Sequence, residues 1–275
     1  MQIDAHHHFW RYNPREYGWI ADDMEVIRRD FLPEDLHAEI FAAGIDGVIS
    51  VQARQTLEET KWLLELATKN DFILGVVGWV DLRAEAVGEQ LNLFAANPKL
   101  KSVRHVVQGE PDEQFLLRPE FERGIHALRR HDLAYDILVF ARQLPQVIAF
   151  VDRHPDQTFV VDHLAKPRIR DGGIGIWTRD MMELGRRPHV FVKLSGLVTE
   201  AAHGNWTPEQ LRPYLDHALE IFGPHRLMFG SDWPVCLVNA SYQQWYQVVT
   251  DWTAPLSPSD QARIMGGTAA EAYRL

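Results

Sequence analysis

The sequence predicts an α/β protein built as a single (β/α)8 barrel domain over residues 1–275. Eight short runs of apolar and β-branched residues recur along the chain, and amphipathic segments typical of helices separate them. Because the runs are apolar almost throughout, they suit parallel strands that are covered on both faces. Eight strands alternating with helices in a chain of this length favour a closed barrel over a doubly wound open sheet, which needs fewer strands.

The first predicted strand, IDAHHHF, carries three consecutive histidines. Side chains alternate along a strand, so Asp4, His6 and His8 are expected on one face, with Ile3 and His7 on the other. We expect His6 and His8 to point into the barrel. The eight predicted strands are residues 3–9, 47–53, 72–80, 100–107, 133–139, 158–164, 189–196 and 226–234.

Helix signals lie between these runs. Thr207 suits an N-cap, with Pro208 in the first helical position and Gln210 placed to reach back, and Gly223-Pro224 suits the end of the same helix. Ser257-Pro258 repeats the starting pattern near the end of the sequence. The clearest predicted helices are residues 33–44, 57–70, 119–132 and 207–223.

The composition narrows the class of partner. The formal charge of −10 is spread along the chain, which argues against binding to nucleic acid. No apolar stretch is long enough for a membrane span, and no basic-then-apolar leader is evident. Cys236 is the only cysteine, which suits a reducing cytoplasm. We therefore expect a cytoplasmic protein with a small-molecule partner, and the sequence makes no prediction of the oligomeric state.

Long segments follow the first, sixth and seventh predicted strands, on the barrel face where catalytic residues collect. Six tryptophans fall at strand ends or in these segments, which predicts a wall of rings suited to a sugar or an aromatic ligand. They are Trp10, Trp19, Trp79, Trp177, Trp206 and Trp233.

Four candidate chemical groups converge on the same face. His6 and His8 end the first strand, His163 ends the sixth, and Asp232 ends the eighth, which is next to the first in a closed barrel. Three imidazoles and one carboxylate suit zinc, manganese or iron with an open position for water. Each residue alone has a purely structural explanation, but their convergence predicts a metal or proton-transfer site.

Other strand ends supply candidate substrate-binding residues. Either Arg104 or His105 must face the interior, where a cation would hold a carbonyl or carboxylate group. Gln52 and Lys193 are candidates of the same kind. A lysine is costly to bury without a partner, which favours a role in the site for Lys193. Trp79 joins this set as part of the predicted wall of rings.

The motifs HxH, DHLAKP, KLSG, GSDWP and the closing GGTAAEAYRL resemble those of the amidohydrolase superfamily. The resemblance runs from residue 2 to residue 275. It is strongest to the amidohydrolase-2 branch of sugar-lactone hydrolases, which includes L-fuconolactonases and L-rhamnonolactonases. It implies a hydrolase that opens the ester ring of a sugar-acid lactone, with Asp232 managing the proton of the attacking water and His163 beside it in the catalytic set.

The sequence departs from the wider superfamily pattern in two places. Residues 133–139 contain no histidine, and Arg104 and His105 stand where binuclear members carry a lysine or glutamate. We therefore expect at most one metal ion, zinc first, held by His6, His8, His163 and Asp232. The branch also leaves open a metal-free enzyme in which the three histidines bond directly to the substrate.

Two other functions fit the same residues. One is a decarboxylase or hydratase of an unsaturated or aromatic-derived acid, although the extra acidic and histidine ligands usual in such relatives are missing. The other is a barrel that only binds a sugar or a metal, which leaves a complete acid–base set unexplained. The stereochemistry of the substrate is not predicted by the sequence, since a shared fold does not define a substrate.

Overall fold

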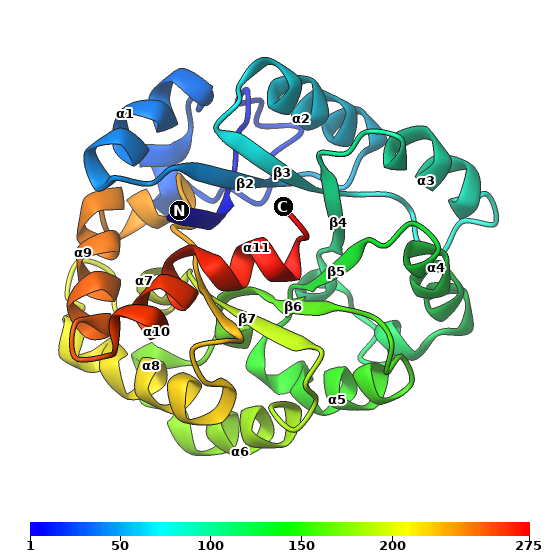
Figure 1. Cartoon of the computed structure of the whole chain (residues 1–275). Helices are drawn as coiled ribbons and strands as arrows, with labels where there is room; N and C mark the ends of the chain where they lie inside the picture. The colour runs from blue at the N-terminus through cyan, green and yellow to red at the C-terminus, as the bar shows by residue number, and fades with distance from the viewer.

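The computed structural model describes all 275 residues and confirms the predicted barrel (Figure 1). Eight parallel strands pair in chain order, and each lies within its predicted range but ends several residues early. Several of the residues that leave the sheet in this way line the site, among them His8, His163 and Asp232. The strands are β1 (Ile3–His7), β2 (Gly47–Val51), β3 (Ile73–Gly78), β4 (Leu100–His105), β5 (Ala134–Ile137), β6 (Phe159–Val161), β7 (Val190–Leu194) and β8 (Leu227–Phe229).

The segment after β8 closes the barrel against β1. His7 forms a parallel bridge with Trp233, His8 N donates to Trp233 O at 2.6 Å, and Asp232 N donates to His6 O at 2.7 Å. Gly230 permits this approach, because a Cβ there would lie 2.8 Å from the Cβ of His6. The backbone pairing therefore fixes Asp232 beside the histidines of β1.

The helices surround the barrel, and the five predicted helix starts are confirmed. Gln210 Oε1 accepts from Thr207 N at 3.1 Å, and Ser257 Oγ accepts from Asp260 N at 3.1 Å, as the capping patterns predict. The helices are α1 (Pro33–Ala43), α2 (Leu57–Lys69), α3 (Val87–Ala95), α4 (Pro119–Arg129), α5 (Leu144–Asp152), α6 (Ile174–Leu184), α7 (Leu197–Glu200), α8 (Pro208–Phe222), α9 (Tyr242–Thr253), α10 (Pro258–Ala262) and α11 (Thr268–Ala272).

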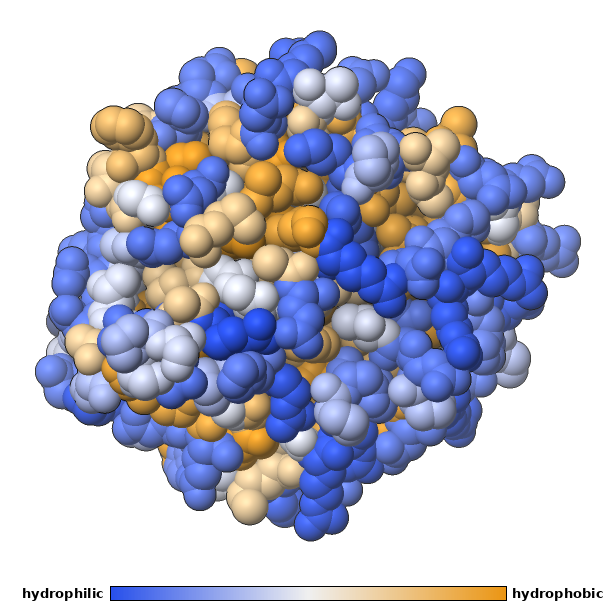
Figure 2. All heavy atoms as spheres, in the orientation of Figure 1, coloured by the Kyte–Doolittle hydropathy of each residue, from blue (hydrophilic) through white to orange (hydrophobic).

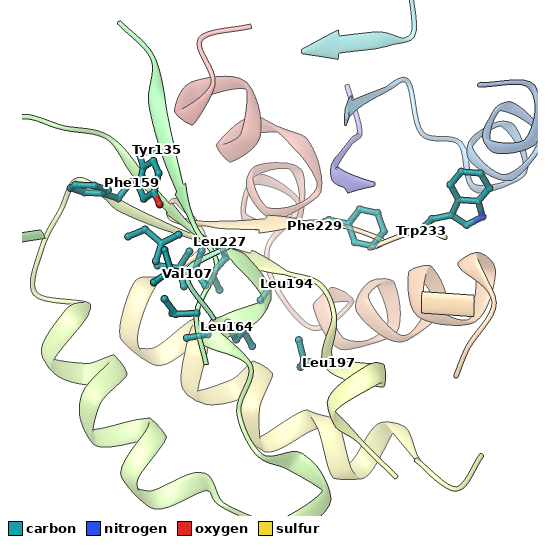
Figure 3. Packing of buried hydrophobic residues seen from close by; sticks show 14 of the residues in the cluster. Val107, Tyr135, Phe159, Leu164, Leu194, Leu197, Leu227, Phe229 and Trp233 are labelled. Atoms are coloured by element: carbon teal, nitrogen blue, oxygen red, sulfur yellow. The ribbon is translucent and has the colours of Figure 1, made fainter. Parts of the chain in front are cut away.

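Apolar side chains form two cores. The larger lies between the sheet and the surrounding helices, where Tyr135 of β5 packs edge to face on Phe159 of β6 (Figure 3). The smaller fills the barrel and includes residues of α11, which crosses the centre of the barrel in Figure 1. Thr268 Oγ1 bonds to Pro224 O, just before β8, so α11 covers the end where the strands begin. The opposite end is left for a ligand.

One sequence argument needs correction at β1. Ile3 and Ala5 belong to the inner core, whereas the Asp4 carboxylate accepts from the Tyr242 hydroxyl of α9 on the outer side. His6 nevertheless points inward, because a β-bulge breaks the pairing of β1 with β2 between Asp4 and His7. The prediction that His6 faces inward is right, but the strict alternation that grouped it with Asp4 is wrong.

The surface around the covered end is mixed in character. Figure 2 views this end and shows hydrophilic residues around the edge, with smaller apolar areas between them. None of the helices is both long and apolar enough to cross a lipid bilayer.

Tyr273→Phe should destabilise the barrel by removing the bond that ties the C-terminal segment to β5. The buried Tyr273 hydroxyl donates to Asp136 Oδ2 at 2.7 Å, and losing a bond to a charged partner costs about 1.5–3 kcal/mol. Tyr246→Phe is the matched control, since its hydroxyl meets the neutral Gln2 amide and its loss should cost about 1 kcal/mol or less. Urea unfolding measures both, and equal small effects would contradict this role of Tyr273.

Candidate active site

A cavity of about 980 Å³ opens at the end of the barrel where the strands finish. His8, Arg104, His163 and Asp232 all line it, so the structure brings these predicted residues together. His6 lies directly beneath them and is fully buried. This is the position at which enzymes of the barrel fold carry their catalytic groups.

Three imidazole nitrogens converge on one carboxylate oxygen. His8 Nε2 lies 3.4 Å from Asp232 Oδ1, His6 Nε2 lies 3.7 Å from it, and His163 Nε2 lies 3.9 Å from it. The two nitrogens of His6 and His8 are themselves 3.2 Å apart. Side chains from β1 and from the segments after β6 and β8 therefore share one small volume.

These distances fit a single divalent metal ion. Ligands at about 2.1 Å from a tetrahedral ion lie about 3.4 Å from one another, and the separations among His6 Nε2, His8 Nε2 and Asp232 Oδ1 run from 3.2 to 3.7 Å. Arg104 Nη1 also lies 3.4 Å from His6 Nε2, so a metal ion would share this side of His6 with a guanidinium. Asp162 is the one further carboxylate nearby, and Arg104 and Lys193 each hold it at 2.9 Å. Two sets of three side chains therefore have the spacing to hold a metal ion: His6, His8 and Asp232, and His6, Asp162 and His163.

The protonation states suit either metal binding or acceptance of a proton. His8 Nδ1 donates to Val51 O at 2.8 Å, so its Nε2 presents a lone pair to the centre. Burial holds the pKa of His6 well below its usual value and lowers that of His163 to about 4. Burial by itself raises the pKa of the Asp232 carboxyl, but the facing His163 and His8 outweigh it and the pKa falls below its usual value. At neutral pH Asp232 is therefore a carboxylate, and the imidazoles of His6 and His163 are neutral.

An unusual backbone turn delivers His163. Residues 163–166 all have positive φ, between 50° and 56°, which is a left-handed turn of four residues that are not glycine. The indole of Trp177 donates to Leu164 O at 2.7 Å, and His163 Nδ1 lies 2.8 Å from Ser195 Oγ. Gly196 gives the ring its space, since a Cβ there would lie 2.5 Å from His163 Nδ1.

A buried charge network supports His6 from below. Lys193 Nζ lies 3.1 Å from His6 Nδ1 and makes ion pairs with Asp136 at 2.6 Å and Asp162 at 2.9 Å. Lys193 and Asp162 are fully buried. Lys193, which was predicted to bind substrate, therefore lies under the site and does not line the cavity.

Gln52 also acts beneath the cavity. Its backbone carbonyl and its side-chain oxygen both accept from Arg104 Nη2, and its side-chain amide donates to Arg104 O at 3.3 Å. Gln52, which was predicted to bind substrate, is fully buried, does not line the cavity and holds Arg104 in position.

Of the two residues at the end of β4, Arg104 faces the site and His105 does not. His105 stacks on Phe115 at 4.7 Å between ring centroids, bonds to Glu110 at 2.7 Å and accepts from the Trp79 indole at 3.4 Å. Neither His105 nor Trp79 lines the cavity. Both were predicted to bind substrate, and the outward turn of alternate residues in β4 explains why they lie elsewhere.

The predicted wall of tryptophans is wrong as well. Trp10, Trp177 and Trp233 are buried in the outer core, where Trp10 packs edge to face on Phe31. Trp206 lies outside this cavity, in a groove beside α8 and α9. Trp19 is the one tryptophan that lines the cavity.

Polar residues that sequence reasoning missed take the place of those rings. They lie in the segments that follow β1, β2, β6 and β7, and this position was the available signal; one of them stands inside the DHLAKP motif. The charged members of this wall are Glu16, Asp23, Arg54, Lys166, Arg170 and Glu200. The cavity therefore suits a ligand rich in hydroxyl groups more than a flat apolar one.

Comparisons with known proteins agree with this geometry. A family model described as amidohydrolase matches residues 3–275. An L-fucono-1,5-lactonase of Burkholderia multivorans is 43% identical, over 100% of this chain and 96% of that protein. An L-fucono-1,5-lactonase of Burkholderia ambifaria is 37% identical over the same shares of the two chains. A solved amidohydrolase from Burkholderia multivorans with bound zinc has a TM-score of 0.97 at 44% identity, and the match covers 100% of this chain and 99% of that one.

Gly196→Ala should remove activity through displacement of His163. The new Cβ would lie 2.5 Å from the ring, in a backbone with φ +66°, so the ring must move. Gly44→Ala is a matched control, because Gly44 has φ +70° with nothing within 4 Å of an added Cβ. Both variants should lose about 1–2 kcal/mol of stability, and only Gly196→Ala should lose activity per folded molecule. Equal activity in the two would contradict the assigned role of Gly196.

Proposed function

This chain belongs to the amidohydrolase family, and we propose that it hydrolyses a sugar-acid lactone of the L-fucono-1,5-lactone type through attack by a water molecule that Asp232 deprotonates. It is an enzyme that acts on sugar lactones, as two lactonases similar over the whole chain indicate. The observation that carries the chemistry is the convergence of three imidazole Nε2 atoms on Asp232 Oδ1. We propose that residues 1–275 act as a single cytoplasmic domain.

Asp232 is well placed to act as the general base. The contacts described above use its Oδ1 atom, so Oδ2 is left to take a proton from water in the cavity. The water oxygen then bonds to the carbonyl carbon and the carbonyl oxygen gains negative charge. When the bond from that carbon to the ring oxygen breaks, Asp232 returns the proton to the ring oxygen, and the product is an open-chain hydroxy acid.

Arg104 and the histidines stabilise the charge that develops. The guanidinium of Arg104 lines the floor of the cavity, held by Asp162 and Gln52, and is fixed before the substrate arrives. A divalent ion held by His6, His8, His163 and Asp232 would polarise the carbonyl group and lower the pKa of water. We propose zinc as this ion, because the donor set fits it and a similar solved protein holds zinc.

The lactonase function is preferred to decarboxylation or hydration of an unsaturated acid. The carboxylates of the cavity are matched in number by its cations, Arg54, Arg104, Lys166 and Arg170, so net charge does not separate the two classes of substrate. What favours the lactonase is that two relatives matching the chain from end to end are L-fucono-1,5-lactonases.

Asp232→Asn should abolish lactone hydrolysis with little loss of fold. An amide of the same size cannot accept the proton, so we expect kcat to fall by about 10²–10⁴-fold. Proton release from L-fucono-1,5-lactone, followed with a pH indicator, measures the rate. Asp180→Asn is the control, since its carboxylate is also buried but lies in α6, where it pairs with Arg179 and does not line the cavity. The control variant should be less stable, but its folded fraction should keep the wild-type kcat. A near-normal kcat for Asp232→Asn would show that Asp232 is not the base.

Removal of metal should lower activity and zinc should restore it. We expect elemental analysis to find up to one zinc ion per chain, and His8→Ala to lose it, because His8 Nε2 is directed at the shared centre. Dialysis against a chelator should reduce kcat/KM by at least about 10-fold, in line with the several kcal/mol of charge stabilisation that a metal supplies. Full activity with no metal bound would instead assign the three histidines to direct bonds with the substrate.

A further inference from the structure

An ion pair in the cavity wall has no part in the chemistry described so far. Lys166 Nζ lies 3.7 Å from Glu200 Oε1, and both side chains line the cavity together with His163 and Asp232. Lys166 follows β6, and Glu200 is the last residue of α7, which follows β7. The pair therefore stands on the β6–β7 side of the site.

The left-handed turn explains why Lys166 reaches the cavity. Residues three apart lie on nearly the same side of so tight a turn, so His163 and Lys166 project together. Leu164 and Ala165, between them, are fully buried in the outer core. The same strained segment thus supplies one group to the reactive centre and a second to the wall.

Neither member of the pair has a hydrogen-bond partner in the protein. The two charged groups form an ion pair, but their 3.7 Å separation exceeds the length of a hydrogen bond. The side chain of Lys166 is only 18% exposed and that of Glu200 only 22%. Burial, and Asp232 nearby, raise the pKa of the Glu200 carboxyl, which marks an ionised group short of stabilising donors. Arg54, elsewhere in the wall, is by contrast paired with Glu16 and Glu59.

We propose that Lys166 and Glu200 bind ring hydroxyl groups of the lactone and determine which hydroxylated lactones the enzyme accepts. This inference rests on the proposed lactonase function. A carboxylate accepts hydrogen bonds from hydroxyls and an ammonium donates to them, so a polyol satisfies both at once. A 1,5-lactone carries hydroxyls on the three ring carbons between the carbonyl carbon and the ring-closing carbon, within reach of the wall when the carbonyl carbon is beside Asp232.

Turnover of L-fucono-1,5-lactone and its three monodeoxy analogues tests the assignment. For each lactone, kcat/KM is measured with the wild type, Glu200→Gln and Lys166→Met. We expect the wild type to lose about 10- to 100-fold on at least one deoxy analogue, because a site built to bond a hydroxyl rejects the analogue without it. On the parent lactone, kcat/KM of each variant should fall by a similar factor relative to the wild type. On that deoxy analogue, kcat/KM of the variant should be little lower than that of the wild type.

Glu122→Gln is the matched control. Glu122 is 21% exposed and pairs with Arg153 at 2.6 Å on the outside of the barrel, so its variant should behave as the wild type on all four lactones. Thermal unfolding of each variant confirms that the fold is kept, and Lys166→Met decides the matter if Glu200→Gln does not fold.

Three outcomes would overturn the assignment. Equal losses on all four lactones would make the pair part of the chemistry, and unchanged rates would leave it without a role in binding. A wild type that hydrolyses none of the lactones would overturn the proposed function and this inference together. An active wild type whose variants still discriminate among the four lactones as the wild type does overturns the hydroxyl assignment alone.

Discussion

The site depends on the backbone pairing that closes the barrel between β1 and the segment after β8. His8 N and Asp232 N each donate across this seam, at 2.6 and 2.7 Å, and Gly230 lets the two chains approach. These bonds hold a carboxylate from one end of the sequence beside two imidazoles from the other. A site assembled on rigid backbone keeps its geometry without the entropy cost of ordering long side chains.

A layer of buried charge lies between that seam and the apolar core of the barrel. Lys193 and Arg104 neutralise Asp162, and Lys193 also meets Asp136, so opposite charges balance in the interior. Each ion would be costly to bury alone, but the network satisfies them together and leaves little freedom to His6 above it. Polar residues that look like substrate ligands along the strands thus serve to position the groups that meet the substrate.

The sequence was a reliable guide where the physics is local. Strand and helix positions follow from hydrophobic periodicity and capping residues such as Thr207 and Ser257, which act within a few positions of the chain. The identity of the central group, with His6, His8, His163 and Asp232, also followed once the barrel placed all strand ends on one face. The predicted wall of tryptophan rings is wrong, because a large ring at a strand end packs equally well under a loop, as Trp10 and Trp233 do.

By itself, then, the sequence determined the barrel and its direction, and it named four candidate residues, His6, His8, His163 and Asp232, that the structure brings together. Only the tertiary structure decided how individual side chains turn: a bulge in β1 sends both Ala5 and His6 inward, and a left-handed turn aims His163 and Lys166 into one cavity. Neither feature has a local signature, because residues that are not glycine adopt them only when packing elsewhere compensates the strain. The partners that hold Lys193 lie 31 and 57 positions away along the chain, and no local pattern records such contacts.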